Sequence, residues 1–166
     1  MKRLGLHSIS VQTRDCALGE AQGATSENAP KSTESASMPT WHSYADRVLV
    51  DAPCSGLGTL HRHADARWRQ SCQSVEALSL MQSQLLNQCS TWVKSEGTLV
   101  YSTCTLQPLE NETVVNRFLE EHPNWMVDAP TDNPLFAPLL SSEGWIKVWP
   151  HQQNMDGFFM ARLRRK

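Results

Sequence analysis

The sequence predicts an α/β fold whose sheet is largely parallel, and this prediction rests on three observations. Two short apolar runs, RVLVDA at 47–52 and TLVYST at 98–103, are typical of strands buried on both faces. A long segment between them repeats its apolar residues at helical spacing. A second helical segment follows the second run, and this alternation of strand and helix is typical of parallel α/β proteins.

The elements before residue 47 are short. The residues MKRLG are typical of a helix end that stops at Gly5, and residues 8–13 alternate apolar and polar side chains as a short strand does. Residues 19–40 are almost wholly small and polar, so we expect a flexible loop there. With 166 residues, of which 40% are hydrophobic and 19% charged, the chain has the size and composition of one globular domain.

The later elements have clearer boundaries. The first long helix is expected over 74–94, with Ser74 as its N-cap and Gly97 as its stop. The second is expected over 108–122, with Pro108 in its first turn and Pro123 after its end. Two further apolar strands, at 144–150 and 157–164, flank the short turn HQQNMD and predict an antiparallel hairpin.

Charge and hydropathy disfavour several classes of protein. No apolar run approaches the roughly 20 residues of a membrane helix, and the N-terminus lacks an apolar signal segment. We therefore expect no membrane partner and a cytoplasmic location. The net charge of −2 disfavours a dedicated nucleic-acid-binding module, so any nucleic-acid contact has to be local. Two local basic clusters, at 61–70 and 161–166, are by themselves more typical of solvated faces.

Two loops follow the predicted buried strands, DAPCSG after the first and STCT after the second. Ligands of open parallel sheets bind beyond the carboxyl ends of the strands. If one crossover helix joins these strands as neighbours, their ends lie about 5 Å apart. Asp51, Cys54 and Cys104 then converge on one crevice. A free cysteine is more often a small buried hydrophobe, and we expect that of the other three, Cys16, Cys72 and Cys89.

Other functions of these loops have less support. SGLGTL lacks the third glycine of a dinucleotide-binding fingerprint, because His61 stands in its place. Its glycines are instead expected to let the backbone turn sharply and approach a ligand closely. His61 and His63 have no carboxylate or cysteine at metal-ligand spacing, so no metal site is predicted. Asp15, after the 8–13 strand, either accepts a hydrogen bond from a ligand amine or caps a turn.

Taken together, these motifs resemble a known family. The segments RVLVDAPCSGLGTLHRHADARWR, GTLVYSTCTLQPLENETVV and PHQQNMDGFFMARL resemble the cytosine-5 RNA methyltransferases of the Sun (RsmB-like) family, whose bacterial members modify small-subunit ribosomal RNA. With the spacing between them, the three segments cover most of residues 46–163. The resemblance implies the Rossmann-like fold of class I S-adenosylmethionine-dependent methyltransferases, with S-adenosylmethionine as cofactor and RNA as partner.

The resemblance also implies roles for individual residues. Cys104 of STCT matches the nucleophile, and Cys54 of APCSG matches the second cysteine, which assists release of the methylated product. Asp51 is placed to contact the cytosine ring or the methyl donor, and Asp15 to contact the adenosine of the cofactor. Four residues of the first basic cluster are candidates for holding the RNA backbone or stacking on a base: Arg62, Arg67, Trp68 and Arg69.

Residues 1–45 depart from the family pattern. They lack the glycine-rich first loop that holds the methionine part of the cofactor, and the acidic residue that binds its ribose. We therefore expect residues 1–166 to be a partial catalytic domain that is truncated at its N-terminus. Separately, we expect a monomer. Two alternatives stay open. One is a catalytically incompetent fragment or interaction module, and the other is a cysteine hydrolase that uses Cys104 with a histidine such as His151.

Overall fold

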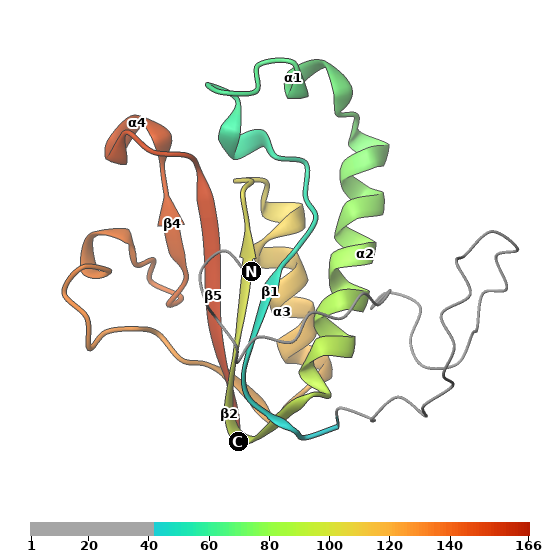
Figure 1. The fold of residues 1–166 in the computed structure, drawn as a ribbon, viewed down its shortest axis with the longest axis vertical. Coiled ribbons are helices and arrows are strands. Elements are labelled where there is room, and N and C mark those ends of the chain that lie inside the picture. Colours follow the sequence, from blue (N-terminus) through green and yellow to red (C-terminus); the bar gives the residue numbers. More distant parts are fainter. Residues whose placement is uncertain (1–41) are drawn as a thin grey trace, which may run out of the picture.

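Residues 42–166 are described by a computed structural model, in which they form one mixed sheet with two long helices packed against it (Figure 1). The sheet runs in the order β1 (Ala45–Asp51), β2 (Val93–Thr103), β5 (Phe158–Arg165) and β3 (Trp125–Val127), and β4 (Ile146–Val148) also pairs with β5. The predicted helix end at 1–5, strand at 8–13 and loop at 19–40 lie outside the described residues.

β1 and β2 are parallel neighbours, as predicted, with Leu49 opposite Val100 and Asp51 opposite Ser102. They are joined by α2 (Cys72–Ser90), which follows the short segments η2 (Leu57–Thr59) and α1 (Ala66–Arg69). β5 runs antiparallel to β2 on its other side. A parallel pair joined by one crossover helix places the carboxyl ends of β1 and β2 at the same edge of the sheet.

α2 begins and ends earlier than the predicted 74–94. Its N-cap is Ser71, whose Oγ accepts a hydrogen bond from the Ser74 N–H at 3.1 Å, while Ser74 Oγ accepts one from the Ser71 N–H at 2.9 Å. Ser74 is therefore the third helical residue of a capping box rather than the cap itself. The helix ends at Ser90, and Val93 is the first residue of β2, where the sheet buries it completely.

Gly97 lies inside β2 instead of ending α2, because β2 begins at Val93 and not at 98. The pairing of β1 with β2 changes register between Ala45 and Arg47, which face Val93 and Thr98. At this irregularity, a Cβ on Gly97 would lie 2.6 Å from Val93 Cγ1. Glycine is thus required by close approach within the strand, and its role as a helix stop was wrongly predicted.

The prediction of a strand buried on both faces is wrong for β1. Val50 is only 6% exposed, whereas Leu49 beside it is 69% exposed. Successive side chains of a strand point to opposite faces, so β1 buries one face only. The two long helices of residues 42–166 both lie on the Val50 side of the sheet (Figure 1).

The remaining elements agree with the prediction in outline. The second predicted helix consists of η3 (Pro108–Glu110) followed by α3 (Glu112–Glu121), and η4 (Ala137–Leu139) precedes β4. β4 and β5 form the predicted antiparallel pair, although α4 (Pro150–Gln153) replaces a simple turn between them. β3, which was not predicted, has only three residues, too few to establish a period-2 pattern.

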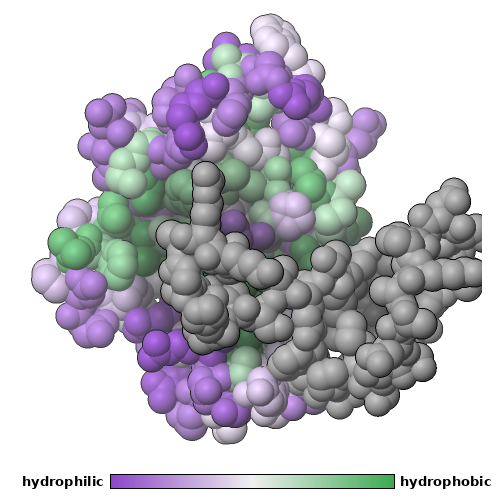
Figure 2. All heavy atoms as spheres, in the orientation of Figure 1, coloured by the Kyte–Doolittle hydropathy of each residue, from purple (hydrophilic) through white to green (hydrophobic). Residues whose placement is uncertain are grey.

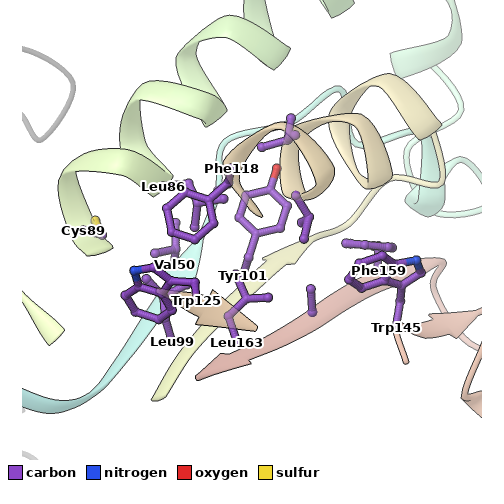
Figure 3. Packing of buried hydrophobic residues seen from close by; sticks show 14 of the residues in the cluster. Val50, Leu86, Cys89, Leu99, Tyr101, Phe118, Trp125, Trp145, Phe159 and Leu163 are labelled. Carbon is purple, nitrogen blue, oxygen red and sulfur yellow. The ribbon is translucent and has the colours of Figure 1, made fainter. Parts of the chain in front are cut away.

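The core lies between the sheet and the two long helices, and Figure 3 shows its packing. Leu86 of α2 and Phe118 of α3 meet Leu99 and Tyr101 of β2 there, and all four are at most 2% exposed. Phe118 also packs edge to face against Trp125, with ring centroids 5.5 Å apart. This apolar packing holds β1 and β2 against α2 and so fixes the sheet edge where their loops begin.

Candidate active site

The loops after β1 and β2 bring two free thiols together. Cys54 Sγ lies 3.4 Å from Cys104 Sγ, although the two residues are 50 positions apart in the chain. The Ala52 N–H donates a hydrogen bond to Ser102 O at 2.9 Å, which extends the strand pairing one residue toward the loops. The predicted convergence of Cys54 and Cys104 is therefore confirmed, and it follows from the parallel pairing of β1 with β2.

Asp51 is the last residue of β1 and lies at the same edge of the sheet. Its Oδ1 accepts a hydrogen bond from Ser102 Oγ at 3.2 Å, and the residue is exposed. The Asp51 carboxylate is thus held in place by β2 while staying accessible to a ligand. An accessible anion at the carboxyl end of a strand is suited to a cationic or hydrogen-bond-donating ligand group.

Gly58 fixes how the two cysteine loops approach each other. Its N–H donates a hydrogen bond to Cys104 O at 3.0 Å, and its carbonyl accepts one from the Gly157 N–H at 2.8 Å. A Cβ on Gly58 would lie 2.2 Å from Gly157 O and 2.7 Å from Cys104 O, both of which are backbone atoms. The prediction that a glycine of SGLGTL permits close backbone approach is confirmed, and the approaching backbone includes that of Cys104.

The surroundings of Cys54 disfavour its thiolate. Burial raises the pKa of the Cys54 thiol from 9.0 to about 12, and the hydrogen bond with Cys104 acts in the same direction. The Gly56 N–H opposes these effects by hydrogen bonding to the sulfur, but it does not outweigh them. At neutral pH Cys54 is therefore a thiol that can donate a hydrogen to the Cys104 sulfur.

A buried carboxylate connects the residues that follow the two cysteines. Glu110 Oε2 accepts hydrogen bonds from the Ser55 N–H at 2.8 Å and from Gln82 Nε2 at 2.9 Å, and Glu110 Oε1 accepts one from Ser55 Oγ at 2.5 Å. Ser55 Oγ also lies 2.9 Å from Thr105 Oγ1. Glu110 and Thr105 are fully buried, and Ser55 is 3% exposed.

Two amide side chains complete this set of contacts. Asn111 Oδ1 accepts a hydrogen bond from Thr103 Oγ1 at 2.6 Å, and Asn111 Nδ2 donates one to Thr105 O at 3.0 Å. Gln82 Nε2 donates to Pro53 O at 2.9 Å as well as to Glu110. Each residue next to Cys54 or Cys104 in the chain is thus held by a buried polar side chain.

Sequence reasoning missed Glu110, Asn111 and Gln82. An acidic residue near a helix start usually faces solvent and complements the helix dipole, so Glu110 carried no distinguishing signal. Gln82 lies on the helix face that the apolar residues define, and its burial there was the one available clue. The hydrogen-bond partners of these side chains depend on tertiary packing, so they cannot be predicted from the local sequence.

The predicted RNA-binding residues lie around α1, at an end of the molecule where Figure 2 shows mainly hydrophilic residues. Trp68 is 84% exposed. Arg62 pairs with Asp156, and Arg69 pairs with Asp65 one helical turn away. Arg67 lines a cavity of about 530 Å³, together with Gln70, Gln107 and Leu109. The arginine side chains of both pairs are exposed, and Asp65 is exposed as well, whereas Asp156 is largely buried.

The remaining residues singled out in the sequence are Asp15, three cysteines and His151. Asp15 and Cys16 lie outside the described residues. Cys89 is buried in the core, as predicted, but Cys72 is exposed, because it is the first residue of α2. The centroid of the His151 ring lies 5.9 Å from that of Trp149. The contacts of His151 therefore give no support to a hydrolase that pairs this histidine with Cys104.

Residues 42–166 lack both a metal-binding cluster and a membrane-spanning helix. That part of the chain contains no group of three or more His, Cys, Asp or Glu side chains that could hold a metal ion. No helix in the same range is long and apolar enough to span a membrane.

Comparison with known proteins supports the family resemblance. The chain matches the family model "16S rRNA methyltransferase RsmB/F" over residues 1–164. A protein of Synechocystis sp., named "Probable ribosomal RNA small subunit methyltransferase B", is 46% identical over 121 residues. The match covers 72% of this chain and 27% of that protein, so the chain spans only about a quarter of this relative's length.

Solved structures also match most of the chain. The crystal structure of PH0851 aligns with a TM-score of 0.69 and 34% identity, over 75% of this chain and 27% of that one. The structure of NSun6 from Pyrococcus horikoshii with SFG aligns with a TM-score of 0.59 and 28% identity, over 70% of this chain and 29% of that one. These matches confirm the predicted Rossmann-like methyltransferase fold for part of the domain. The chain belongs to the 16S rRNA methyltransferase RsmB/F family.

Proposed function

We propose that the chain is the C-terminal part of a catalytic domain that methylates C5 of a cytosine in small-subunit ribosomal RNA, in the cytoplasm, with S-adenosylmethionine as methyl donor. The observation that carries this proposal is the 3.4 Å contact between Cys54 Sγ and Cys104 Sγ at the carboxyl ends of two parallel strands. The family supports the substrate class, because its model is described as a 16S rRNA methyltransferase.

A cysteine thiolate is suited to activate C5 of cytosine, which is a poor nucleophile by itself. The Cys104 thiolate forms a bond to C6, and the electron pair of the C5–C6 double bond moves onto the ring to make C5 nucleophilic. After methylation, a base removes the C5 proton, the double bond forms again, and the Cys104–C6 bond breaks to release the thiolate. The cytosine has to be unpaired or flipped out to present this edge.

Cys54 is suited to the last step, and its protonation state supports that role. Its raised pKa keeps it a thiol at neutral pH, 3.4 Å from the Cys104 sulfur. A hydrogen bond from the Cys54 S–H stabilises negative charge on Cys104 sulfur. That charge exists before attack and again when the thiolate leaves C6. Cys54 therefore favours departure of Cys104 from the methylated base.

The residues present fit one end of an S-adenosylmethionine site. When bound, this cofactor supplies an electrophilic methyl group on a sulfonium. Asp51 is an exposed carboxylate at the strand edge, held by Ser102, and its charge suits a cationic ligand group. Asp51 would contact either the methyl donor or the cytosine ring. We also propose that Asp15 contacts the adenosine.

We propose that the segment around α1 holds the RNA. Trp68 offers an exposed ring on which a base can stack, and Arg67 lies at the rim of a cavity between α1, the start of α2 and η3. Base stacking on aromatic side chains contributes about 1–3 kcal/mol per base. Arg62 and Arg69 would exchange their carboxylate partners for phosphates.

The proposal is tested by incubating the full 166-residue chain with S-adenosylmethionine and small-subunit ribosomal RNA, then measuring 5-methylcytidine in nuclease digests by mass spectrometry. We expect 5-methylcytidine with the unchanged chain and with the control Cys89→Ala, whose thiol lies in the core, and none with Cys104→Ala. Calorimetric titration with S-adenosylmethionine accompanies the assay. Absence of both cofactor binding and 5-methylcytidine would favour the incompetent fragment or interaction module instead.

A further inference from the structure

We propose that Glu110 and Asn111 are positioning residues that set the distance between the Cys54 and Cys104 thiols. They hold the residues that flank each cysteine. We call the following five residues the positioning cluster: Ser55, Gln82, Thr105, Glu110 and Asn111. The proposal deepens the methyltransferase function and rests on it for its catalytic meaning, but the geometry that it describes is measurable without any activity.

The polar contacts of the cluster are concentrated beside the two cysteines. Pro53 and Ser55 precede and follow Cys54, and Gln82 and Glu110 hold them. Thr103 and Thr105 precede and follow Cys104, and Asn111 holds both. Glu110, the last residue of η3, and Asn111, which precedes α3, are adjacent in the chain, so one short segment contacts both loops.

The two loops are linked directly through a pair of hydroxyls. Ser55 Oγ donates its only hydrogen to Glu110 Oε1, so its 2.9 Å contact with Thr105 Oγ1 must use the Thr105 hydrogen. Thr105 therefore donates to Ser55, and Ser55 donates to Glu110. The direction of both bonds depends on the carboxylate, which accepts from every cluster group that it contacts and donates to none.

Glu110 itself is fixed by the surrounding elements. Tyr101 of β2 donates a hydrogen bond from its hydroxyl to Glu110 O at 2.6 Å. Ser79 of α2 donates one to Leu109 O at 2.7 Å. The carboxylate is thus attached to the rigid framework of β2 and α2, and the cysteine loops are attached to the carboxylate. Glu110 therefore joins the core to the loops that carry the two cysteines, and not merely one core element to another.

The effective concentration of one thiol at the other, which depends on how the two loops hold them, is measured by the equilibrium of the full chain with glutathione. One oxidised glutathione takes two electrons and the two protons from the Cys54 and Cys104 thiols, which gives one Cys54–Cys104 disulfide and two reduced glutathiones. Peptide mapping by mass spectrometry quantifies that disulfide at each ratio of the two forms. The midpoint gives the effective concentration of one thiol at the other.

Three variants separate positioning from folding. Thr105→Val keeps the shape of the side chain and removes the hydroxyl. The effective concentration should fall about tenfold, as expected for loss of the buried hydrogen bond to Ser55; the Gln107 N–H also loses its acceptor. Thr105→Ser keeps the hydroxyl and should restore the effective concentration of the unchanged chain. Glu110→Gln should also lower it. An amide nitrogen opposite Ser55 Oγ makes that hydroxyl an acceptor and reverses the Thr105–Ser55 hydrogen bond, and one on the other side faces two N–H donors.

Leu163→Ala is the matched control. Leu163 is fully buried in β5, paired with Leu99 of β2 four residues before Thr103. Its loss should destabilise the fold while the effective concentration of the folded chain stays unchanged. If the chain methylates RNA, Thr105→Val should also lower kcat for methylation with little change in KM for RNA.

The outcomes are distinguishable. A folded Thr105→Val chain with the effective concentration of the unchanged protein would overturn the positioning role, and this holds even if Glu110→Gln does not fold. If Leu163→Ala lowered the effective concentration as much as Thr105→Val does, the positioning role would also be overturned, because the change would then reflect general stability of the fold. If the expected thiol differences appear but no chain forms 5-methylcytidine, the positioning geometry stands and the proposed function fails.

Discussion

At the scale of single residues, the two cysteines differ in the environment that the fold provides. Burial raises the pKa of the Cys54 thiol to about 12, so Cys54 keeps its proton at neutral pH and can donate a hydrogen bond. Cys104 lies in contact with it, at the end of a strand whose neighbours Thr103 and Thr105 are fully buried. The assignment of Cys104 as attacking thiol and Cys54 as assisting thiol is therefore consistent with their physical surroundings.

The pKa of Cys54 leads to a pH-dependent prediction. Iodoacetamide reacts with the thiolate, so its rate at Cys54 of the folded chain should keep rising above pH 9.0, toward about pH 12. In the unfolded chain the rate at the same thiol should level off near pH 9.0. The measurement is peptide-resolved mass spectrometry after timed alkylation, with and without urea.

The sign for stability follows from the same shift. Below pH 9.0 the thiol is protonated in both states, and between 9.0 and about 12 the unfolded chain loses the proton first. The Cys54 contribution to stability therefore falls as pH rises through that range. In the alkylation experiment, a rate at folded Cys54 that levels off near pH 9.0 would show that burial does not raise the pKa of this thiol.

How far the site could be predicted also differs from residue to residue. Cys54 and Cys104 could be found because each follows an apolar run that marks a strand end, and parallel pairing brings strand ends together. Glu110 and Asn111 could not, because their function depends on which side chains of α2 and of the cysteine loops surround them. Burial of a carboxylate is a tertiary property.

At the scale of elements, the strands and helices were predicted better than their ends. α2 shows why: Ser71 and Ser74 both carry side chains that cap helices, and the structure uses both in one reciprocal motif. Val93 falls on the helical period by coincidence, because a buried strand residue and a buried helix residue have the same chemistry. β3 was missed since it owes its pairing to β5 rather than to a pattern of its own.

The capping box gives a prediction for α2. Ser71→Ala removes the side-chain acceptor for the Ser74 N–H, so the free energy of unfolding should fall by about 1 kcal/mol. Ser83→Ala is the control, because Ser83 lies inside the same helix and bonds only to Ser79 O within it. Urea unfolding followed by circular dichroism measures both. Equal stability of Ser71→Ala and the unchanged chain would place the helix start elsewhere.

At the scale of the whole molecule, the sheet is covered unevenly. The helices bury the Val50 face of β1, while the other side presents Leu49. The sequence predicted burial on both faces because a continuous apolar run is typical of central parallel strands. That prediction depended on neighbours for β1 that residues 42–166 do not supply.

Two leucines on adjacent strands test this uneven coverage. Leu49 of β1 is 69% exposed, whereas Leu99 of β2 is fully buried. Leu49→Ala should change the free energy of unfolding by no more than about 0.5 kcal/mol. Leu99→Ala should lower it by about 2–5 kcal/mol, because it leaves a cavity in the core. A loss for Leu49→Ala as large as that for Leu99→Ala would show that this face is covered.

The measurement that tests the central claim most directly is covalent trapping of RNA by variants of the cysteine pair. The full chain is incubated with S-adenosylmethionine and small-subunit ribosomal RNA, and protein–RNA adducts that survive denaturing electrophoresis are counted. Cys54→Ala should accumulate an adduct, because Cys104 attacks C6 but is released slowly without its partner thiol. Cys104→Ala and the double variant should form none. Absence of an adduct with Cys54→Ala, or an adduct with Cys104→Ala, would contradict the assigned roles.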